Sequence, residues 1–357
     1  MRLRSVEAIP YALPFKEPYV TARGTLQRRE MVLLRIRDED GVTGLGEAVP
    51  LALRGGATLE QVVRELEGWR EHREAEGLSA PARCAVETAL MDLRGRRVGK
   101  EAGKSGEDEA VPCNATLVAR PPEEVAAEAE RWAEDGFTTF KLKLGAETAK
   151  TVPEGSFLRS RDSDMAQVRA VREALGPEVR IRVDANEAWD LETAKRTLAA
   201  LEPLGIELAE QPVAGLDEMA ELAAATSIPL AADESVTTVA EAERAASMGA
   251  CAYTGIKLSK VGGPHAALAI ADVLPAYITS ALDGLVGIAA AAQVALSLAE
   301  TGHAERLHLA HGLATQRLFA STIASVECEL RDGKLHLPPG PGLGVEIDEE
   351  ALEAHRL

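Results

Sequence analysis

Two patterns of apolar and polar residues divide the chain into regions. Up to about residue 110, "RREMVLLRIRDEDGVTGLGEAVP" predicts two strands joined at the polar turn "DEDG", whereas "TLEQVVRELEGWREH" and "ARCAVETALMDLRGRR" carry apolar residues at helical spacing. The Gly- and charge-rich stretch "GKEAGKSGEDEA" is typical of a linker. We therefore predict an α+β domain over residues 1–110.

From Val111 onward, short apolar strands alternate with Ala-, Glu- and Arg-rich helical segments. The predicted strands are "VPCNATL", "TTFKLKL", "VRIRVDA", "IELAEQ", "IPLAAD", "AYTGIKL", "AYITSAL" and "RLHLAHG". From Asp184 to Ser280 their polar ends recur about every 23–26 residues, the length of one βα unit. A doubly wound sheet would normally carry a Gly-rich phosphate loop after its first strand, and "CNATLVARPP" is none. The pattern therefore favours an α/β fold with a (β/α) barrel over residues 111–320.

Two further segments stand out from this alternation. Residues 321–357 return to strand-like alternation with a Pro/Gly turn, and we expect them to pack on the first domain. Residues 146–163 make the interval after the second barrel strand longer than a βα loop needs. This insertion lies where barrel active sites are built, so it is either a functional lid or a surface insertion.

Composition narrows the classes of function. Acidic residues outnumber Lys and Arg by 18, which disfavours nucleic acid and anionic membranes as partners. The first residues hold no signal-peptide core and no segment approaches about 20 uninterrupted apolar residues, so we expect a cytoplasmic protein. The four cysteines are scattered without a CxxC pair and suggest neither zinc nor disulfides.

Charged residues gather at the carboxyl ends of the predicted barrel strands. They are Lys141, Lys143, Asp184, Asn186, Glu210, Asp233, Glu234, Lys257 and Lys260. Singly, each acid could be a helix N-cap or a turn residue. Together, three acids on three consecutive strands would repel one another, and a divalent cation resolves this. Oxygen-only ligands indicate Mg²⁺, with Mn²⁺ as an alternative ion, and an anionic substrate could bind there too.

Two lysines would flank this ion from opposite walls of the barrel. Lys143 lies on the second strand and Lys257 on the sixth. A lysine held beside another cation loses basicity, and Lys141 is such a neighbour for Lys143. A metal opposite a lysine base suits proton abstraction next to a carboxylate, because the metal stabilises the enediolate while the lysine takes the proton. The alternative for "FTTFKLKLG" is a solvent-facing edge strand.

The motifs "KLKLG", "VDAN", "EQP", "ADES" and "IKLSKVGG", in this order, resemble the muconate-lactonising-enzyme subgroup of the enolase superfamily over essentially the whole chain. The resemblance implies a modified TIM (β/α) barrel, capped by an α+β domain formed by the N-terminal region and the C-terminal tail. The pairing of a lysine base with Mg²⁺ is a known feature of this superfamily. The roles implied are Asp184, Glu210 and Asp233 as Mg²⁺ ligands, Lys143 and Lys257 as catalytic lysines, and Lys141, Asn186 and Glu234 as supporting residues. Lys260 is interpreted as a surface or helix-start charge.

The seventh strand end, "SALDGLVGIAA", resembles one branch of the o-succinylbenzoate synthases. These enzymes dehydrate 2-succinyl-6-hydroxy-2,4-cyclohexadiene-1-carboxylate in menaquinone biosynthesis. The resemblance implies that backbone amides near Ser280 and Leu282 meet a substrate carboxylate, and that Gly312 of "HGLAT" lies at the substrate. Arg23, Arg28 or Arg29 would meet the second carboxylate, although arginines near strand starts usually face solvent.

Several alternatives stay open at this point. The shared half-reaction also serves a racemase or epimerase of N-acylamino acids or dipeptides, and a muconate-type cycloisomerase. A barrel retained as a non-catalytic binding protein is a further alternative. The eighth strand, "LHLAHGLAT", lacks the Asp-x-Asp of the dipeptide epimerases, and His311 is either a substrate contact or a structural residue. A homo-oligomer is also left open.

Overall fold

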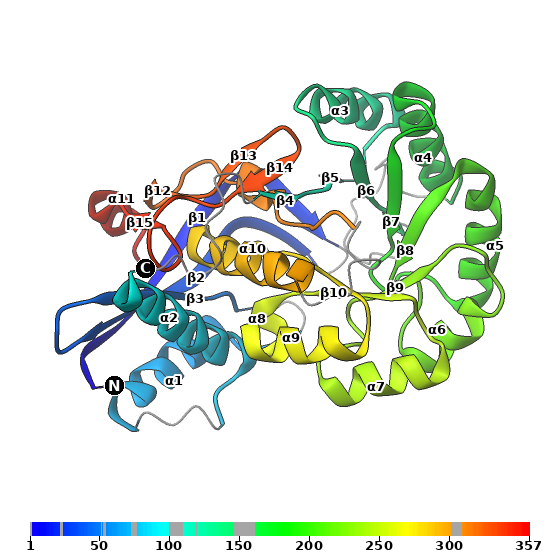
Figure 1. The fold of residues 1–357 in the computed structure, drawn as a ribbon. Helices are drawn as coiled ribbons and strands as arrows, with labels where there is room; N and C mark the ends of the chain where they lie inside the picture. Colours follow the sequence, from blue (N-terminus) through cyan, green and yellow to red (C-terminus); the bar gives the residue numbers. More distant parts are fainter. Residues whose placement is uncertain are drawn as a thin grey trace.

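The computed structural model describes residues 2–21, 24–50, 52, 55–72, 77–99, 110–118, 120–145, 161–300 and 309–357. The N-terminal region forms an antiparallel sheet of β1 (Leu3–Thr21), β2 (Gly24–Asp38) and β3 (Thr43–Ala48), in that order. Helices α1 (Leu59–His72) and α2 (Ala80–Val98) accompany it on the left of Figure 1. Strands β2 and β3 match the two predicted strands, whereas β1 was not predicted.

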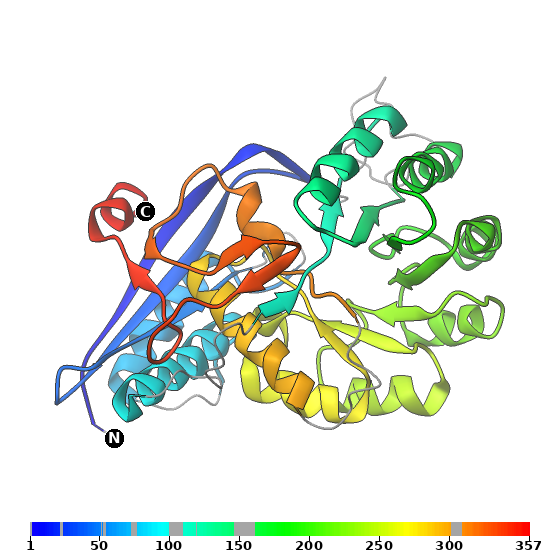
Figure 2. The same cartoon turned by 45° about the horizontal axis from the view of Figure 1, so that its top comes forward.

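The second region is a parallel sheet of seven strands. The strands are β5 (Ala115–Leu117), β6 (Thr139–Lys143), β7 (Arg180–Asp184), β8 (Ile206–Glu210), β9 (Leu230–Ala232), β10 (Tyr253–Ile256) and β11 (Ala276–Ile278), paired in chain order. The helices α3 (Pro122–Glu134), α4 (Arg161–Leu175), α5 (Leu191–Leu201), α6 (Leu216–Ala223), α7 (Val239–Met248), α8 (Leu258–Val261), α9 (Pro264–Val273) and α10 (Leu285–Glu300) connect or follow them. Figures 1 and 2 show helices around the outside of the curved sheet. The predicted fold class, a barrel-like parallel α/β domain with an α+β cap, is confirmed.

The first and last predicted barrel strands differ from expectation. "VPCNATL" is split between β4 (Ala110–Pro112), which leaves the barrel to pair with the C-terminal region, and β5, which stays in it. In the described part of "RLHLAHG", only two isolated parallel bridges form, from His311 to Cys113 and from Gly312 to Thr279. These bridges join the chain after β4 to the chain after β11, so the segment at residues 309–312 takes the eighth position.

The C-terminal region lies against the N-terminal sheet. It contains β12 (Ala324–Val326), β13 (Glu329–Arg331), β14 (Lys334–His336), β15 (Glu346–Ile347) and α11 (Glu349–Ala354). Strand β14 pairs with β4, and the amide of Leu357 donates to the Pro10 carbonyl of β1 at 3.0 Å. No helix in the described ranges is long and apolar enough to cross a membrane. The four cysteines are buried free thiols.

Helix α2 packs on β3 through two glycines of "GLGEA". A Cβ atom on Gly46 would lie 1.9 Å from the carbonyl oxygen of Ala85, and one on Gly44 would lie 2.3 Å from that of Ala89. Backbone atoms cannot move aside as a flexible side chain does. The close approach of helix and sheet therefore depends on glycine at these positions, and it places the rest of β3 against the barrel.

Gly46→Ala is expected to lower the free energy of unfolding by about 3 kcal/mol, because the added methyl group forces α2 away from β3. Gly68→Ala is the matched control, since a Cβ there meets nothing within 4 Å inside α1. It should raise stability by about 0.5–1 kcal/mol through helix propensity. Urea denaturation of the two variants measures both effects, and equal stabilities would contradict this description of the α2–β3 contact.

Candidate active site

The register of the barrel strands aligns the predicted site residues at one end of the sheet. Lys143, the last residue of β6, pairs with Asp184, the last of β7, which pairs with Glu210, the last of β8. Asp233 follows β9 directly and Lys257 follows β10 directly. Because the strands are parallel, these five residues share the carboxyl end of the sheet, with the three acids between the two lysines.

Lys141 joins two of the acids below the mouth of the barrel. Its Nζ lies 3.2 Å from both carboxylate oxygens of Glu210 and 3.2 Å from Oδ2 of Asp184. Burial lowers the pKa of Lys141, but the attraction of Glu210, Asp184 and Asp233 outweighs it, so the pKa lies above its ordinary value. Lys141 is therefore a fixed cation, and "FTTFKLKLG" is not a solvent-facing edge strand, because its β6 lies between β5 and β7.

Lys143 forms the outer contact on the β6 side. It donates to Oδ2 of Asp184 and, at 3.0 Å, to Oδ1 of Asn186. Asn186 has a left-handed backbone (φ 48°), and its Nδ2 donates to Oε1 of Glu234 at 3.1 Å. Burial opposes ionisation of Asp184, but Lys143 and Lys141 hold its pKa well below the usual range. The predicted supporting residues Asn186 and Glu234 thus lie in one network with Lys143.

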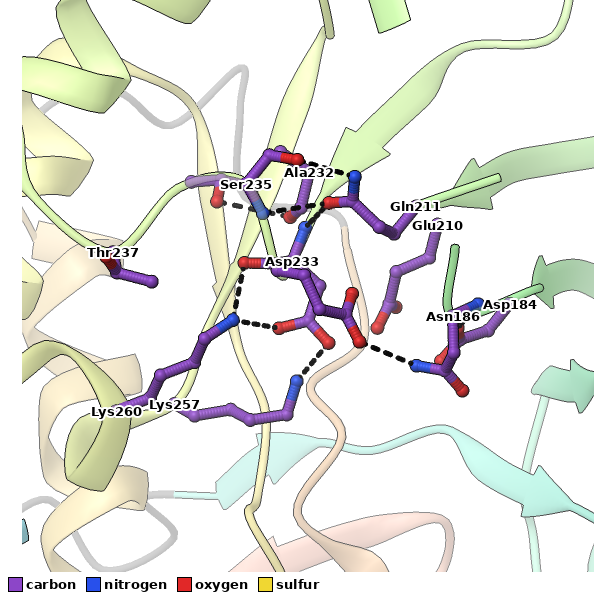
Figure 3. A network of polar contacts seen from close by, with 12 residues as sticks. Asp184, Asn186, Glu210, Gln211, Ala232, Asp233, Ser235, Thr237, Lys257 and Lys260 are labelled. Atoms are coloured by element: carbon purple, nitrogen blue, oxygen red, sulfur yellow. Dashed lines mark hydrogen bonds and ion pairs between the residues drawn. The ribbon is translucent and has the colours of Figure 1, made fainter. Parts of the chain in front are cut away.

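Two lysines meet Asp233 on the opposite side of the site, as Figure 3 shows. Lys257 donates to Oδ2 of Asp233, and Lys260 donates to its main-chain carbonyl at 2.9 Å and lies 3.4 Å from Oδ1. The interpretation of Lys260 as a surface charge is therefore wrong, although the residue does lie in the single turn of α8. Lys260 reaches Asp233 from the short helix α8, which begins directly after Lys257.

Glu210, the central acid, has a partner that the sequence did not reveal. The hydroxyl group of Tyr277 on β11 donates to Oε2 of Glu210 at 2.6 Å, and Tyr277 is fully buried. The guanidinium group of Arg182 lies over the Tyr277 ring, 5.1 Å from its centroid. Burial, with the charge of Glu210, raises the pKa of Tyr277 well above its ordinary value, so the tyrosine stays a donor. Burial, together with Asp184, raises the pKa of Glu210.

Gln211 of the "EQP" motif connects the ends of β8 and β9. Its Oε1 accepts hydrogen bonds from the amides of Asp233 at 2.9 Å and Ser235 at 3.1 Å, and its Nε2 donates to Oγ of Ser235 at 2.7 Å. Figure 3 shows this amide beside the backbone of Asp233. Gln211 therefore fixes the position from which the Asp233 carboxylate enters the site, a role that the sequence did not indicate.

His311 is a structural residue. Its Nδ1 accepts a hydrogen bond from the amide of Ile278 at 2.9 Å, and the ring is buried beside Arg182. Burial first, and the charge of Arg182 second, lower the pKa of His311 to about 3, so the ring is neutral. Of the two roles left open by the sequence, the geometry favours the structural one.

The predicted substrate contacts lie partly within the described ranges. Ser280 donates through Oγ to Oδ2 of Asp283 at 2.7 Å, Leu282 has a left-handed backbone (φ 65°), and the carbonyl of Gly312 accepts from the Ser280 amide at 2.9 Å. These three residues therefore adjoin at the ends of the seventh and eighth strands. Arg23 and most of the 146–163 insertion lie outside the described residues. Arg28 pairs with exposed Glu30, whereas Arg29 is buried.

The donor set of the site fits a hard divalent cation. Asp184, Glu210 and Asp233 are buried carboxylates at the ends of consecutive strands, so the donor atoms that they offer are oxygens. Their oxygens accept hydrogen bonds from lysine ammonium groups. As the side chains stand in the described part of the chain, no group of three or more His, Cys, Asp or Glu residues is arranged so that it could hold a metal ion. A cation at this position would therefore compete with Lys143 and Lys257 for the same oxygens.

Comparisons with known proteins agree with this arrangement. Residues 124–351 match the model described as "Enolase C-terminal domain-like", and residues 4–68 match "Mandelate racemase / muconate lactonizing enzyme, N-terminal domain". The o-succinylbenzoate synthase of Thermobifida fusca is 36% identical over 287 residues, 79% of this chain and 83% of that protein.

Two solved structures are similar over nearly the whole chain. A muconate lactonizing enzyme from Pseudomonas fluorescens, complexed with muconolactone, has a TM-score of 0.88 at 29% identity and covers 100% of this chain and 99% of its own. A dipeptide epimerase from Enterococcus faecalis, complexed with Mg and the dipeptide L-Leu-L-Tyr, has a TM-score of 0.83 at 25% identity and covers 97% of this chain and 100% of its own.

Proposed function

The chain belongs to the enolase superfamily, in the subgroup of the muconate lactonizing enzymes, and we propose that it is a Mg²⁺-dependent o-succinylbenzoate synthase. In this proposal it removes the proton α to the ring carboxylate of 2-succinyl-6-hydroxy-2,4-cyclohexadiene-1-carboxylate and expels the hydroxyl group as water. The reaction would serve menaquinone biosynthesis.

The observation that carries the proposal is the placement of the two lysines. Lys143 ends β6 and Lys257 follows β10, four strands further along the sheet, and three buried acids lie between them. Both side chains remain partly exposed, Lys143 at 25% and Lys257 at 15%, whereas Lys141 is only 7% exposed. A substrate at the mouth can therefore meet a lysine on either side, one as the base and the other as a fixed cation.

Asp184, Glu210 and Asp233 would hold the Mg²⁺ ion at the centre of this arrangement. When bound, the ion stabilises the negative charge that develops on the substrate carboxylate. Lys141 contacts Glu210 and Asp184 from below and offsets part of their mutual repulsion. Since Lys141 stays protonated, it is also the fixed positive neighbour of Lys143.

The chain's own residues account for the proton movements. Lys143, as a neutral amine, takes the α-proton. The electron pair of the broken C–H bond moves into the conjugated system of the ring. Lys143 then gives that proton to the departing hydroxyl group as the C–O bond breaks, so one water leaves and the ring becomes aromatic. Lys257, as an ammonium group on the opposite side, attracts the electron-rich ring. Asn186, held by Glu234, accepts from Lys143 and orients its amine.

Two observations support dehydration over the other reactions of the subgroup. The synthase from Thermobifida fusca reaches 36% identity over 79% of this chain. The muconate lactonizing enzyme and the dipeptide epimerase described above reach 29% and 25% over nearly the whole chain, and an L-Ala-D/L-Glu epimerase from Bacillus subtilis reaches 30% over 83% of it. The loop at Ser280–Asp283 carries the "SALD" sequence, and the segment "LAHGLA" at residues 309–314 offers no Asp-x-Asp to bind a peptide ammonium group. An epimerase remains the second candidate, because the facing lysines would also serve two-sided proton exchange.

A panel of substrates at saturating Mg²⁺ tests this proposal. We expect the cyclohexadiene substrate to give the highest kcat/KM, measured by the absorbance of the aromatic product. Cis,cis-muconate should give no lactone, and N-acylamino acids or dipeptides in D₂O should exchange their α-proton more slowly than the cyclohexadiene reacts. Faster exchange with a dipeptide or an N-acylamino acid would replace the synthase by an epimerase or racemase of the same subgroup.

A further inference from the structure

A buried polar cluster joins the N-terminal sheet to the loop of residues 280–284. Tyr11 of β1, Arg29 of β2 and Glu47 of β3 contribute from the sheet, and each is at most 6% exposed. Asp283, in the loop that follows β11, contributes from the barrel and is also buried. None of these residues belongs to the network of lysines and acids at the barrel mouth, so the cluster has no role in the mechanism above.

Glu47 binds the first turn of α10 from the other domain. Its Oε1 accepts a hydrogen bond from the amide of Gly284 at 2.7 Å, and the amide of Gly287 also donates to this carboxyl group. The Gly284 carbonyl accepts the first intrahelical bond, from Ile288, so Gly284 is the N-cap of the helix. A glycine N-cap has no side chain to satisfy the free amides of the first turn, and Glu47 supplies that acceptor.

The two glycines leave only the space that the carboxylate needs. A Cβ atom on Gly284 would lie 2.7 Å from Oε2 of Glu47 and 2.5 Å from the hydroxyl oxygen of Tyr11. A Cβ atom on Gly287 would lie 2.8 Å from Oε1 of Glu47. The hydroxyl group of Tyr11 completes the site by donating to Oε2 at 2.8 Å. Glycine at positions 284 and 287 therefore lets the Glu47 carboxylate lie directly against the start of α10.

The same cluster holds the loop that precedes the helix. Oδ2 of Asp283 accepts from the Ser280 hydroxyl group at 2.7 Å and from the Ala281 amide at 2.6 Å, and Arg29 donates to the Ala281 carbonyl at 3.3 Å. Leu282, between them, has a left-handed backbone (φ 65°), which costs free energy for a branched side chain unless neighbours hold it. The loop conformation therefore depends on contacts at both of its ends.

We propose that Glu47 is a positioning residue that holds the loop of residues 280–284 in its substrate-binding conformation from the capping domain. The inference rests on the proposed function in one respect, the role of Ser280 and Leu282 in meeting a substrate carboxylate. Glu47 contacts Tyr11 and the first turn of α10 rather than the lysines of the site. It acts through the amides of Gly284 and Gly287. The conformation of the loop at residues 280–284 therefore depends on the N-terminal sheet that carries Glu47.

Ionisation of Glu47 affects the loop and the whole fold in opposite directions. Burial, reinforced by Asp283, raises the pKa of Glu47 from its ordinary value of 4.5 to about 7. The stability that this group contributes is fully present below about pH 4.5 and is lost as the pH rises through about 7. Over the same rise the carboxylate gains its charge, and charge-assisted bonds to the helix amides are stronger than neutral ones. The loop should therefore tighten while the overall stability falls.

Apart from Asp283, the charged or titratable groups that face Glu47 in the described part of the chain keep one charge state near pH 7. Burial raises the pKa of Tyr11 and of the Cys84 thiol, so both stay neutral near pH 7. Burial lowers the pKa of Arg29 only to about 10, so it stays charged. Burial raises the pKa of Asp283 as well, which makes this acid the one competitor for a pH effect near Glu47.

Glu47→Gln isolates the charge, because the amide oxygen can still accept from Gly284 while the amide nitrogen faces Tyr11. In the wild type, protection of the amides at residues 280–287 from hydrogen exchange, corrected for intrinsic rates, should rise about fivefold from pH 6 to pH 8. In the variant it should stay at the low-pH level. At pH 8 the variant should also show a KM raised about fivefold with kcat changed less than twofold, and a higher melting temperature.

Glu30→Gln is the matched control, since it removes one exposed carboxylate of β2 that pairs with Arg28, and it should leave loop protection unchanged. Tyr11→Phe is a second variant that loses one hydrogen bond to Glu47, and it should move the pH midpoint of loop protection upward. Wild-type protection and pH dependence in Glu47→Gln would overturn the proposal and assign the effect to Asp283. An unshifted midpoint in Tyr11→Phe would also overturn it.

The hydrogen-exchange measurement uses the ligand-free protein. It therefore tests whether Glu47 holds the loop of residues 280–284 even if the synthase assignment fails. KM is then measured with whichever carboxylate of the panel the protein turns over. Reduced protection with an unchanged KM would overturn the link between the loop and the substrate, while leaving the assigned reaction untouched.

Discussion

Lys143→Ala is expected to reduce kcat by about 10⁴-fold, because no other side chain in the described part of the site can take the α-proton from the same side. Lys141 cannot replace it, since that ammonium group is buried against Glu210 and Asp184 and stays protonated. The measurement is the steady-state rate of aromatic product at saturating Mg²⁺. Mg²⁺ affinity, measured by calorimetry, should persist, because the variant keeps all three acids.

Lys195→Ala serves as the control for this loss. Lys195 lies on α5 and pairs with Glu221 at 2.8 Å on the surface, so its removal should leave kcat unchanged. A Lys143→Ala variant that keeps more than a tenth of the wild-type kcat would exclude Lys143 as the base. Such a result would leave Lys257 as the candidate on the opposite wall.

Glu210→Gln is expected to weaken Mg²⁺ binding by at least about 100-fold and to abolish turnover at ordinary Mg²⁺ concentrations. The amide offers one weaker oxygen where the carboxylate offers a charged one, at the centre of the three acids. Tyr277→Phe should have a smaller effect, about tenfold in Mg²⁺ affinity, because it removes only the hydrogen bond that orients Glu210.

Calorimetric titration with Mg²⁺ alone measures both variants without any substrate. Asp217→Asn is the control, since Asp217 lies on α6 and pairs with Arg244 at the surface. Wild-type Mg²⁺ affinity in Glu210→Gln would contradict the assignment of the three acids as ligands, whatever the reaction is. Equal losses in Glu210→Gln and Tyr277→Phe would instead point to general unfolding, which the melting temperature would reveal.

The ends of the barrel strands were predictable from sequence because parallel strands bring their carboxyl ends together. Asp184, Glu210, Asp233 and Lys257 could be placed in one site without knowing any side-chain contact, and the structure brings them together. Lys260 could not be placed in the site, because the direction of its side chain depends on the geometry of α8, a helix of only four residues. Tyr277 looks like any aromatic residue of a buried strand, and only the packed barrel shows that its hydroxyl group meets Glu210.

The contacts between the N-terminal region and the barrel could not be predicted from the sequence pattern, for a different reason. Strand β1 contains Pro10, Pro14 and Pro18, which interrupt the strand pattern and are tolerated because β1 is an edge strand. Glu47 and Gly284 are 237 positions apart, and nothing in the local sequence of either one indicates the other. Such a pair emerges only when the α2–β3 packing and the barrel are both in place.

The most direct test of the proposed function is to incubate the purified protein with the cyclohexadiene substrate and to follow the aromatic product, first with Mg²⁺ and then after chelation of Mg²⁺. We predict rapid formation of o-succinylbenzoate with Mg²⁺, none after chelation, and full recovery when Mg²⁺ is restored. No product in the presence of Mg²⁺ would contradict the proposed synthase. Product formation that survives chelation would contradict a metal-dependent site built on Asp184, Glu210 and Asp233.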